Sequence, residues 1–209
     1  MSSTTSDVND WTRSDIYHNS FLIPPDATLD SALKLSEQNG LPPIQAHRIL
    51  EVGTLGGYST IWFAKALPPD GEIITCEISE HYAKVAQQNI DHAGLTSRVK
   101  IVLGPAIDTL SRLHSDETFD LAFIDADKQS NVDYFIQAKR LVRNQGVIIV
   151  DNVVRSGRVA DPIQSDPSVD GVRRLLQYIH NDSTVEATTM GTVGEKGYDG
   201  FLFAINKPR

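Results

Sequence analysis

The sequence has few of the features that mark secreted, membrane or nucleic-acid-binding proteins. Cys76 is the one cysteine in 209 residues, which excludes a disulfide framework within the chain and is typical of a reducing compartment. No apolar run approaches the roughly 18 residues of a membrane span, and Met1–Asp10 is polar and acidic, unlike a signal peptide. The net charge of −8 argues against nucleic acid and anionic membranes as partners. We therefore expect a soluble cytoplasmic protein.

The sequence also lacks the G-x-G-x-x-G turn of dinucleotide-binding enzymes and has a different glycine turn. The stretch ILEVGTLGGYSTIWFAKAL, Ile49–Leu67, predicts a buried strand, a G-x-x-G-G turn and a helix. This succession brings free backbone N–H groups and the positive end of a helix dipole close to a ligand. Glu51, in the strand, would repel a pyrophosphate and hold a positive charge. The pattern therefore predicts a nucleotide-like ligand with a cationic part.

The domain organisation follows from the hydrophobic pattern. Met1–Asp10 predicts a disordered tail, and residues 11–209 predict a single domain with an N-terminal helical segment, 11–43. Apolar runs typical of buried parallel strands are Ile49–Val52, Ile73–Cys76, Val99–Leu103, Leu121–Ile124 and Val147–Val150. Helical patterns between and after them are Glu80–Ala93, Ala106–Leu113, Val132–Val142 with Phe135 and Ile136 inward, and a stripe of Val172, Leu175, Leu176 and Ile179.

Two further strands follow the last helical pattern. Val185–Val193 and Phe201–Ile205 have no helix between them, so we expect an antiparallel hairpin at the edge of the sheet. The predicted fold class is α/β, a doubly wound and mostly parallel seven-stranded sheet that ends in this hairpin.

Carboxylates follow four of the five predicted parallel strands. The first strand contains Glu51 near its end, and the second is followed by Glu77. The fourth is followed by Asp125-Ala126-Asp127-Lys128 and the fifth by Asp151-Asn152. Ligands of doubly wound sheets bind outside the carboxyl ends of the strands. The sequence therefore predicts a functional cleft at this rim.

Glu77 is a candidate ligand for a ribose. It lies 24 positions after Gly53, near the offset of roughly 20 residues at which an acid reaches a ribose diol. The alternative is a strand-end acid that caps the next helix. The glycine turn and Glu77 fit either NAD or an adenosyl ligand, and Glu51 favours the sulfonium and ammonium groups of S-adenosylmethionine.

Asp125, Asp151 and Asn152 form a candidate metal site. All three offer hard oxygen ligands without Cys or His, which suits Mg²⁺, Mn²⁺ or Ca²⁺ and disfavours zinc. The alternative is a set of loop carboxylates that are hydrogen-bonded to one another. Lys128 could take a proton from a substrate hydroxyl, or serve only as a salt-bridge partner of these acids.

Four segments carry a family resemblance. ILEVGTLGGYSTIWFAKAL, FIDADK, VIIVDNVVRSGRV and VGEKGYDGF resemble the class I cation-dependent O-methyltransferases, the family of the caffeoyl-CoA and catechol O-methyltransferases, and most closely its microbial branch. The resemblance implies a Rossmann-like methyltransferase fold, S-adenosylmethionine as cofactor, and a divalent cation, with Mg²⁺ first. It also implies a homodimer and a small vicinal-diol aromatic acceptor of catechol, phenylpropanoid or flavonoid type.

The resemblance also implies roles for individual residues. Those near the cofactor are Glu51, Gly53, Thr54 and Ser59 for the methionine part, Glu77 for the ribose, Ala106 for the adenine, and Asp125 and Asp127. Apart from the resemblance, Tyr58 could lie against the cofactor, with a packing role as the alternative. The metal ligands are Asp125, Asp151 and Asn152. The catalytic residues are Lys128, as the base, and Asp125, and the acceptor-side residues are Lys128 with Arg155 and Ser156 in the loop Val153–Asp161.

One departure from the family pattern leaves an alternative open. Relatives continue from the Leu-Pro-Pro segment into a helix, whereas here Ile44–Arg48 leads almost directly into the first strand. The missing helix makes a non-catalytic or weakened S-adenosylmethionine-binding protein the alternative. A nicotinamide oxidoreductase would require G-x-G-x-x-G and would have no use for the acidic metal ligands.

Overall fold

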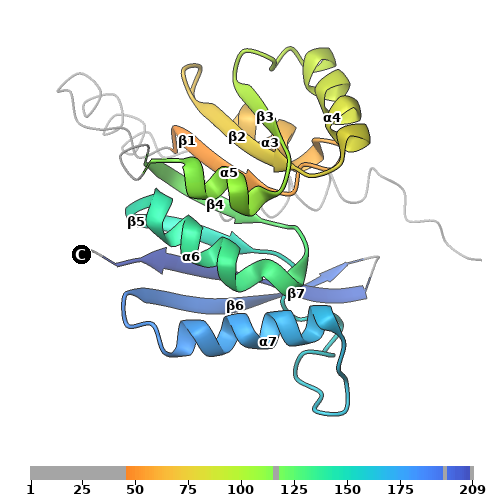
Figure 1. Ribbon diagram of the computed structural model, residues 1–209, viewed down its shortest axis with the longest axis vertical. Coiled ribbons are helices and arrows are strands. Elements are labelled where there is room, and N and C mark those ends of the chain that lie inside the picture. The colour runs from red at the N-terminus through yellow and green to blue at the C-terminus, as the bar shows by residue number, and fades with distance from the viewer. Residues whose placement is uncertain (1–45, 115–117, 195–196, 208–209) are drawn as a thin grey trace, which may run out of the picture. The chain divides into compact units, whose positions relative to one another are not determined.

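The computed structural model describes residues 46–114, 118–194 and 197–207, which contain a seven-stranded sheet (Figure 1). Its strands are β1 (Arg48–Val52), β2 (Glu72–Glu77), β3 (Val99–Leu103), β4 (Phe119–Ile124), β5 (Val142–Val150), β6 (Val185–Gly194) and β7 (Gly197–Asn206). Its helices are α3 (Tyr58–Ala66), α4 (Glu80–His92), α5 (Ala106–Arg112), η1 (Lys128–Ser130, a 3-10 turn), α6 (Asn131–Leu141) and α7 (Pro167–His180). The predicted tail and the N-terminal helical segment lie outside the described residues.

The strand order β3-β2-β1-β4-β5-β7-β6 confirms the doubly wound sheet. β1 pairs in parallel with both β2 and β4. The sheet therefore extends from β1 through β2 to β3 on one side, and from β4 to β5 on the other. β7 pairs antiparallel with β5 and with β6, which confirms the edge hairpin. Within the hairpin the second strand, β7, lies beside β5, and the first strand, β6, forms the edge of the sheet.

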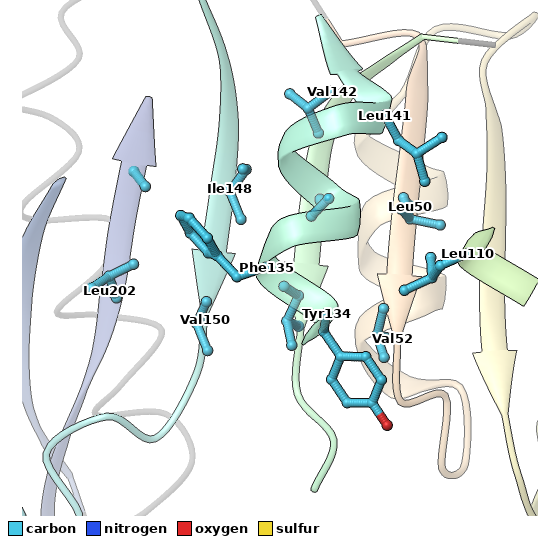
Figure 2. Packing of buried hydrophobic residues seen from close by; sticks show 14 of the residues in the cluster. Leu50, Val52, Leu110, Tyr134, Phe135, Leu141, Val142, Ile148, Val150 and Leu202 are labelled. Atoms are coloured by element: carbon cyan, nitrogen blue, oxygen red, sulfur yellow. The ribbon is translucent and has the colours of Figure 1, made fainter. Parts of the chain in front are cut away.

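Alternate residues of the central strands enter two cores on opposite faces of the sheet, as a period of two requires. Ile49 and Ile73 join the core formed with α3 and α4. Leu50 and Ile74 join the larger core formed with α5, α6 and α7. Figure 2 shows Phe135 and Leu141 of α6 packed among strand residues of the larger core. The resulting layers hold the ends of β1, β2, β4 and β5 at one rim.

Two details differ from the sequence-based expectation. Ile136 is 37% exposed, because the inward stripe of α6 runs through Tyr134, Phe135, Ala138 and Leu141. β5 begins at Val142, directly after α6, whereas the sequence predicts a helix through Val142 and a strand from Val147. The pairing of β5 with β4 shifts register between Phe119 and Leu121. Among the described residues, no helix combines the length and the apolar character that crossing a membrane requires.

Candidate functional site

A cleft of about 800 Å³ lies at the rim where four parallel strands end. Of the sequence-predicted site residues, those that line it are Gly53, Thr54, Tyr58, Ser59, Glu77, Ala106, Asp125, Asp127 and Asp151. The predicted residues that do not line it are Glu51, Lys128, Asn152, Arg155 and Ser156. The fold therefore gathers most of the candidates from distant parts of the chain into one cavity, and the other five lie outside its lining.

Gly53 brings the glycine turn against the end of β4. It has a φ of 103°, and a Cβ atom there would lie 2.1 Å from the backbone oxygen of Asp125. Gly57, with φ 78°, precedes α3, whose first turn contains no acidic residue and no side-chain cap. The first N–H groups of the helix are therefore not capped by side chains, as at an anion- or polar-ligand site. A side chain at position 53 would separate the turn from Asp125 at the end of β4.

Glu51 is completely buried beneath this turn. Its carboxylate accepts hydrogen bonds from the hydroxyl groups of Ser59 (2.5 Å), Thr60 (2.5 Å) and Thr75 (2.6 Å). Burial raises the pKa of Glu51, and the three hydroxyl groups oppose that shift. Because Ser59 lines the cleft and Glu51 does not, the carboxylate reaches the cleft through this serine. Neither threonine was a predicted site residue.

Glu77 closes the opposite side of the turn. Its carboxylate accepts from the backbone N–H of Leu55 at 2.8 Å and from that of Ser79 at 2.9 Å. The bond from Leu55 links β2 to the glycine turn. The bond from Ser79 lies at the start of α4 and matches the alternative expected for Glu77, a strand-end acid that caps the next helix. Glu77 also lines the cleft, and each carboxylate oxygen has a further lone pair for a ligand.

The segment after β4 forms an acidic corner that is tied down by two side chains. Lys128, which is 6% exposed, donates from Nζ to Oδ1 of Asp125 at 2.9 Å. The hydroxyl of Tyr134 donates to Oδ1 of Asp127 at 2.7 Å. Tyr134 lines the cleft and was not predicted, and its hydroxyl extends beyond the apolar side chains around it (Figure 2). Burial and Asp127 together raise the pKa of Tyr134, so it remains a donor.

Asp151 and Asn152 complete the corner from β5. Burial raises the pKa of Asp151, and the neighbouring charge of Asp125 adds to the rise, while Lys128 opposes it. The N–H of Asn152 donates to Oδ1 of Asp151 at 2.7 Å, and Asn152 has a left-handed φ of 56°. Asp125 and Asp151 are close enough for the charge of one to act on the other, and with the amide oxygen that Asn152 can offer they make a donor set that suits a hard divalent cation.

This donor set contains fewer carboxylates than a metal site built from acidic side chains alone. Within residues 46–114, 118–194 and 197–207, no three His, Cys, Asp or Glu side chains are grouped so that they could hold a metal. The predicted centre has only two carboxylates, and its third donor is an amide. A cation there would need oxygen atoms from water or substrate to complete its coordination.

Arg155 and Ser156 lie in the loop after the acidic corner, with left-handed φ values of 52° and 55°. The backbone of this loop is hydrogen-bonded to Tyr198, Asp199 and Gly200 of β7. None of these β7 residues was singled out as a site residue, although the turn Gly194–Gly200 was expected to help select the acceptor and the VGEKGYDGF segment contributed to the family resemblance. A signal for them was therefore present in the sequence without a physical interpretation.

Comparison with known sequences identifies relatives of nearly the whole chain. A sequence model of the family described as O-methyltransferase matches residues 41–202. A catechol O-methyltransferase of Mycobacterium tuberculosis is 41% identical over 208 residues, which cover 91% of this chain and 94% of that protein. A catechol O-methyltransferase of Niastella koreensis is 49% identical over 165 residues, 78% of this chain and 75% of that protein.

Solved structures agree with these sequence matches. An O-methyltransferase from Bacillus cereus in complex with SAH has a TM-score of 0.74 and 42% identity, and the match covers 96% of this chain and 100% of that one. The O-methyltransferase TomG from Streptomyces achromogenes in complex with SAM has a TM-score of 0.76 and 37% identity, with 98% and 100% coverage.

Proposed function

The chain belongs to the O-methyltransferase family of S-adenosylmethionine-dependent enzymes, and we propose that it methylates one hydroxyl of a small vicinal-diol aromatic with the help of a divalent cation. The observation that carries the proposal is the contact of Gly53 with the backbone of Asp125. It joins the glycine turn, which suits the cofactor, to the acidic corner, which suits a cation and a diol. One cleft can then hold donor and acceptor side by side.

In this proposal the cofactor lies along the glycine turn. Glu77 would accept hydrogen bonds from the ribose hydroxyls, and Ala106 would border the adenine with Tyr58 against it. Ser59, Thr54 and the N–H groups of the turn would bind the methionine part. Glu51 would act through Ser59, because its own carboxylate is buried behind the cleft wall.

The cationic part of the cofactor would face the acidic corner. Asp125 and Asp127 line the cleft next to the turn, and Tyr134 holds Asp127 in a fixed orientation. Because this part of the cleft is bordered by carboxylates, it favours the sulfonium and the ammonium group over a neutral or anionic ligand. The same charges disfavour NAD, whose pyrophosphate is anionic.

Asp125, Asp151 and Asn152 would hold the divalent cation, with Mg²⁺ as the first candidate and Mn²⁺ or Ca²⁺ as alternatives. When bound, the cation would lower the pKa of the acceptor hydroxyl. Burial, with a smaller contribution from Asp125, raises the pKa of Asp151, and the charge of the cation would oppose both effects.

Lys128, in its neutral amine form, would take the proton of the acceptor hydroxyl. Its amine lies at the acidic corner, 2.9 Å from Oδ1 of Asp125, and is shielded from solvent. Arg155 and Ser156 would border the acceptor from the loop 153–161. Methyl transfer needs no covalent enzyme intermediate, so these residues contribute by alignment and by control of charge.

The acceptor class is supported by the relatives, two of which are named catechol O-methyltransferase. These relatives are 41% and 49% identical to the chain, so a weakened, non-catalytic cofactor-binding protein is not favoured. We assign no specific acceptor, since flavonoid, phenylpropanoid and simple catechol rings offer the same pair of hydroxyls.

We further propose a cytoplasmic homodimer without nucleic-acid or membrane partners. The net charge of −8 and the single cysteine support the location and the exclusions. The edge strand β6 supports self-association, because nine of its ten residues are exposed and Ala187–Gly194 carries no charge. Light scattering after size exclusion would test the assembly.

The central experiment is methylation of a catechol acceptor before and after removal of metal. The protein is stripped with EDTA, assayed with S-adenosylmethionine, and assayed again after addition of Mg²⁺, with the methylated product detected by mass spectrometry. We expect turnover to be lost on stripping and restored by Mg²⁺. Unchanged turnover in a protein shown by elemental analysis to be metal-free would exclude the cation. Binding of the cofactor without methylation of any diol would exclude the acceptor class.

A further inference from the structure

We propose that Asp199 of β7 is a positioning residue that fixes Asn152 and the following loop, residues 153–161. The proposal rests on the proposed function, because Asn152 is one of the proposed metal ligands. Asp199 does not line the cleft. It lies in β7, whereas Asn152 follows β5. The carboxylate would therefore act through the backbone and would not touch the substrate.

One oxygen of Asp199 collects three backbone N–H groups. Its Oδ1 accepts from Val154 at 3.1 Å, from Arg155 at 2.7 Å and from Gly200 at 2.8 Å. Two of these donors belong to the loop. The carboxylate therefore supplies an acceptor that a partner strand would supply within a sheet, and charge-assisted bonds of this kind are stronger than neutral ones.

The bonds on either side extend the same connection. The N–H of Val153 donates to the carbonyl oxygen of Gly200 at 2.8 Å, and that of Ser156 donates to the carbonyl oxygen of Tyr198 at 3.2 Å. Every N–H group from residue 153 to residue 156 thus donates to the segment 198–200. Without Asp199, the two central donors would lose their acceptor.

The loop requires this support because its backbone is strained. Asn152, Arg155 and Ser156 have φ values of 56°, 52° and 55°, in the left-handed region that residues other than glycine rarely adopt. Such conformations persist only where the surroundings over-determine them. Since Asn152 adjoins the first anchored residue, release of the loop would let its backbone leave the left-handed conformation, and the proposed metal ligand would no longer be held in place.

Close packing leaves the loop little room to shift while the anchor is intact. A Cβ atom at Gly200 would lie 2.6 Å from the backbone oxygen of Met190 and 2.7 Å from a methyl carbon of Val154. A Cβ atom at Gly157 would lie 2.1 Å from the hydroxyl of Tyr198. The start of β7 is therefore a fitted support for the loop.

The test compares Asp199→Ala and Asp199→Asn with Glu186→Ala, an exposed carboxylate variant on the adjacent strand that is ion-paired with Lys207. Amide hydrogen exchange of the segment 153–158 is measured in the metal-free full chain. Mn²⁺ affinity is measured by calorimetry on the protein saturated with S-adenosylhomocysteine. The first readout reports the loop alone, and the second reports the proposed metal site.

We expect Asp199→Ala to speed exchange of the loop amides several-fold and to raise the Kd for Mn²⁺ by about tenfold or more. The Kd for S-adenosylhomocysteine should stay within about twofold, since the glycine turn is untouched. Asp199→Asn keeps an acceptor oxygen and should recover most of both losses. Glu186→Ala should match the unmodified protein.

Wild-type exchange rates in Asp199→Ala would overturn the inference. A loss in Asp199→Asn as large as in Asp199→Ala would also overturn it, because charge and not the acceptor geometry would then be responsible. If the unmodified chain binds no Mn²⁺, the proposed metal site fails, whereas faster exchange in Asp199→Ala still supports the anchor. Should Asp199→Ala not fold, Asp199→Ser, with a shorter acceptor, takes its place, and exchange no faster than in Asp199→Asn overturns the inference.

Discussion

Lys128, at the rim of the sheet, combines a structural role with a proposed chemical role. Its amine is paired with Asp125, which satisfies a structural role, and it lies at the corner where an acceptor hydroxyl would lose its proton. A buried ammonium needs such a partner, whether or not it takes part in chemistry. A pair of substitutions separates the two roles.

Lys128→Ala and Lys128→Arg should both lower turnover by about a hundredfold or more, with the Kd for S-adenosylmethionine changed by less than about threefold. Arginine preserves the ion pair with Asp125 but cannot give up its proton at neutral pH. Steady-state kinetics and calorimetry measure the two quantities. Turnover close to that of the unmodified protein in Lys128→Arg would reduce Lys128 to a salt-bridge partner.

Glu51 should make the stability of the protein depend on pH. Burial raises its pKa in the folded state above the ordinary value of 4.5, so the folded protein holds the proton more tightly than the unfolded chain does. This contribution to stability is complete below the ordinary value and is lost as the pH rises through the raised pKa. The free energy of unfolding should therefore fall over that window relative to that of Glu51→Gln. Urea titrations of both proteins at several pH values measure it, and parallel curves would contradict the expectation.

At the scale of elements, the contact between α7 and η1 controls the position of η1, the turn that contains Lys128. Gly171 lies in the middle of α7, and a Cβ atom there would be 2.1 Å from the backbone oxygen of Lys128 and 2.6 Å from its carbonyl carbon. The helix can approach the turn this closely because residue 171 has no side chain. The position of Lys128 thus depends on a residue more than forty positions away along the chain.

Gly171→Ala is expected to destabilise the protein by about 2 kcal/mol. Helix propensity alone would predict the opposite, since alanine is favoured over glycine by about 1 kcal/mol in a helix interior. The steric overlap with the backbone of η1 should outweigh that gain. Chemical denaturation measures the change. Gly191→Ala is the matched control, because a Cβ atom at Gly191 meets nothing within 4 Å; equal stability of the two variants would contradict the steric argument.

At the scale of the whole molecule, the cleft is shared by the glycine turn, the ends of β2 and β4 and the start of α5. A ligand that fills it contacts segments that are separate in the unfolded chain. Cofactor binding should therefore stabilise the entire sheet, because the unfolded chain has no comparable site.

S-adenosylmethionine at about one hundred times its Kd should raise the free energy of unfolding by about 2.7 kcal/mol. NAD at the same concentration should leave it unchanged, because the acidic corner disfavours its pyrophosphate. Denaturant titrations with each ligand measure the difference. Stabilisation by NAD, with none by S-adenosylmethionine, would point to a nicotinamide enzyme.

Local patterns were enough to predict the sheet and its rim. The apolar run Val99–Leu103 coincides with β3, and β1, β2 and β4 extend past their predicted runs by one or two residues at an end. The start of β5 was predicted wrongly, since the strand begins at Val142 and not at Val147. Local patterns predict the buried face of a helix less well, since Ile136 is exposed and Tyr134 is buried in α6. Adjacent helix positions differ by about 100°, so a short apolar cluster does not reveal which residue faces the sheet.

The sequence by itself determined the kinds of element, their order and the residues that follow each strand, because these depend on periodicity and on the rule that parallel strands end at one rim. Only the tertiary structure decided that Glu51 lies behind Ser59, that Gly171 meets Lys128, and that Asp199 supports the loop after Asn152. The last two contacts join segments more than forty residues apart, and the first links a strand to the helix that follows it. They depend on side-chain direction and close packing between layers, which no local pattern encodes.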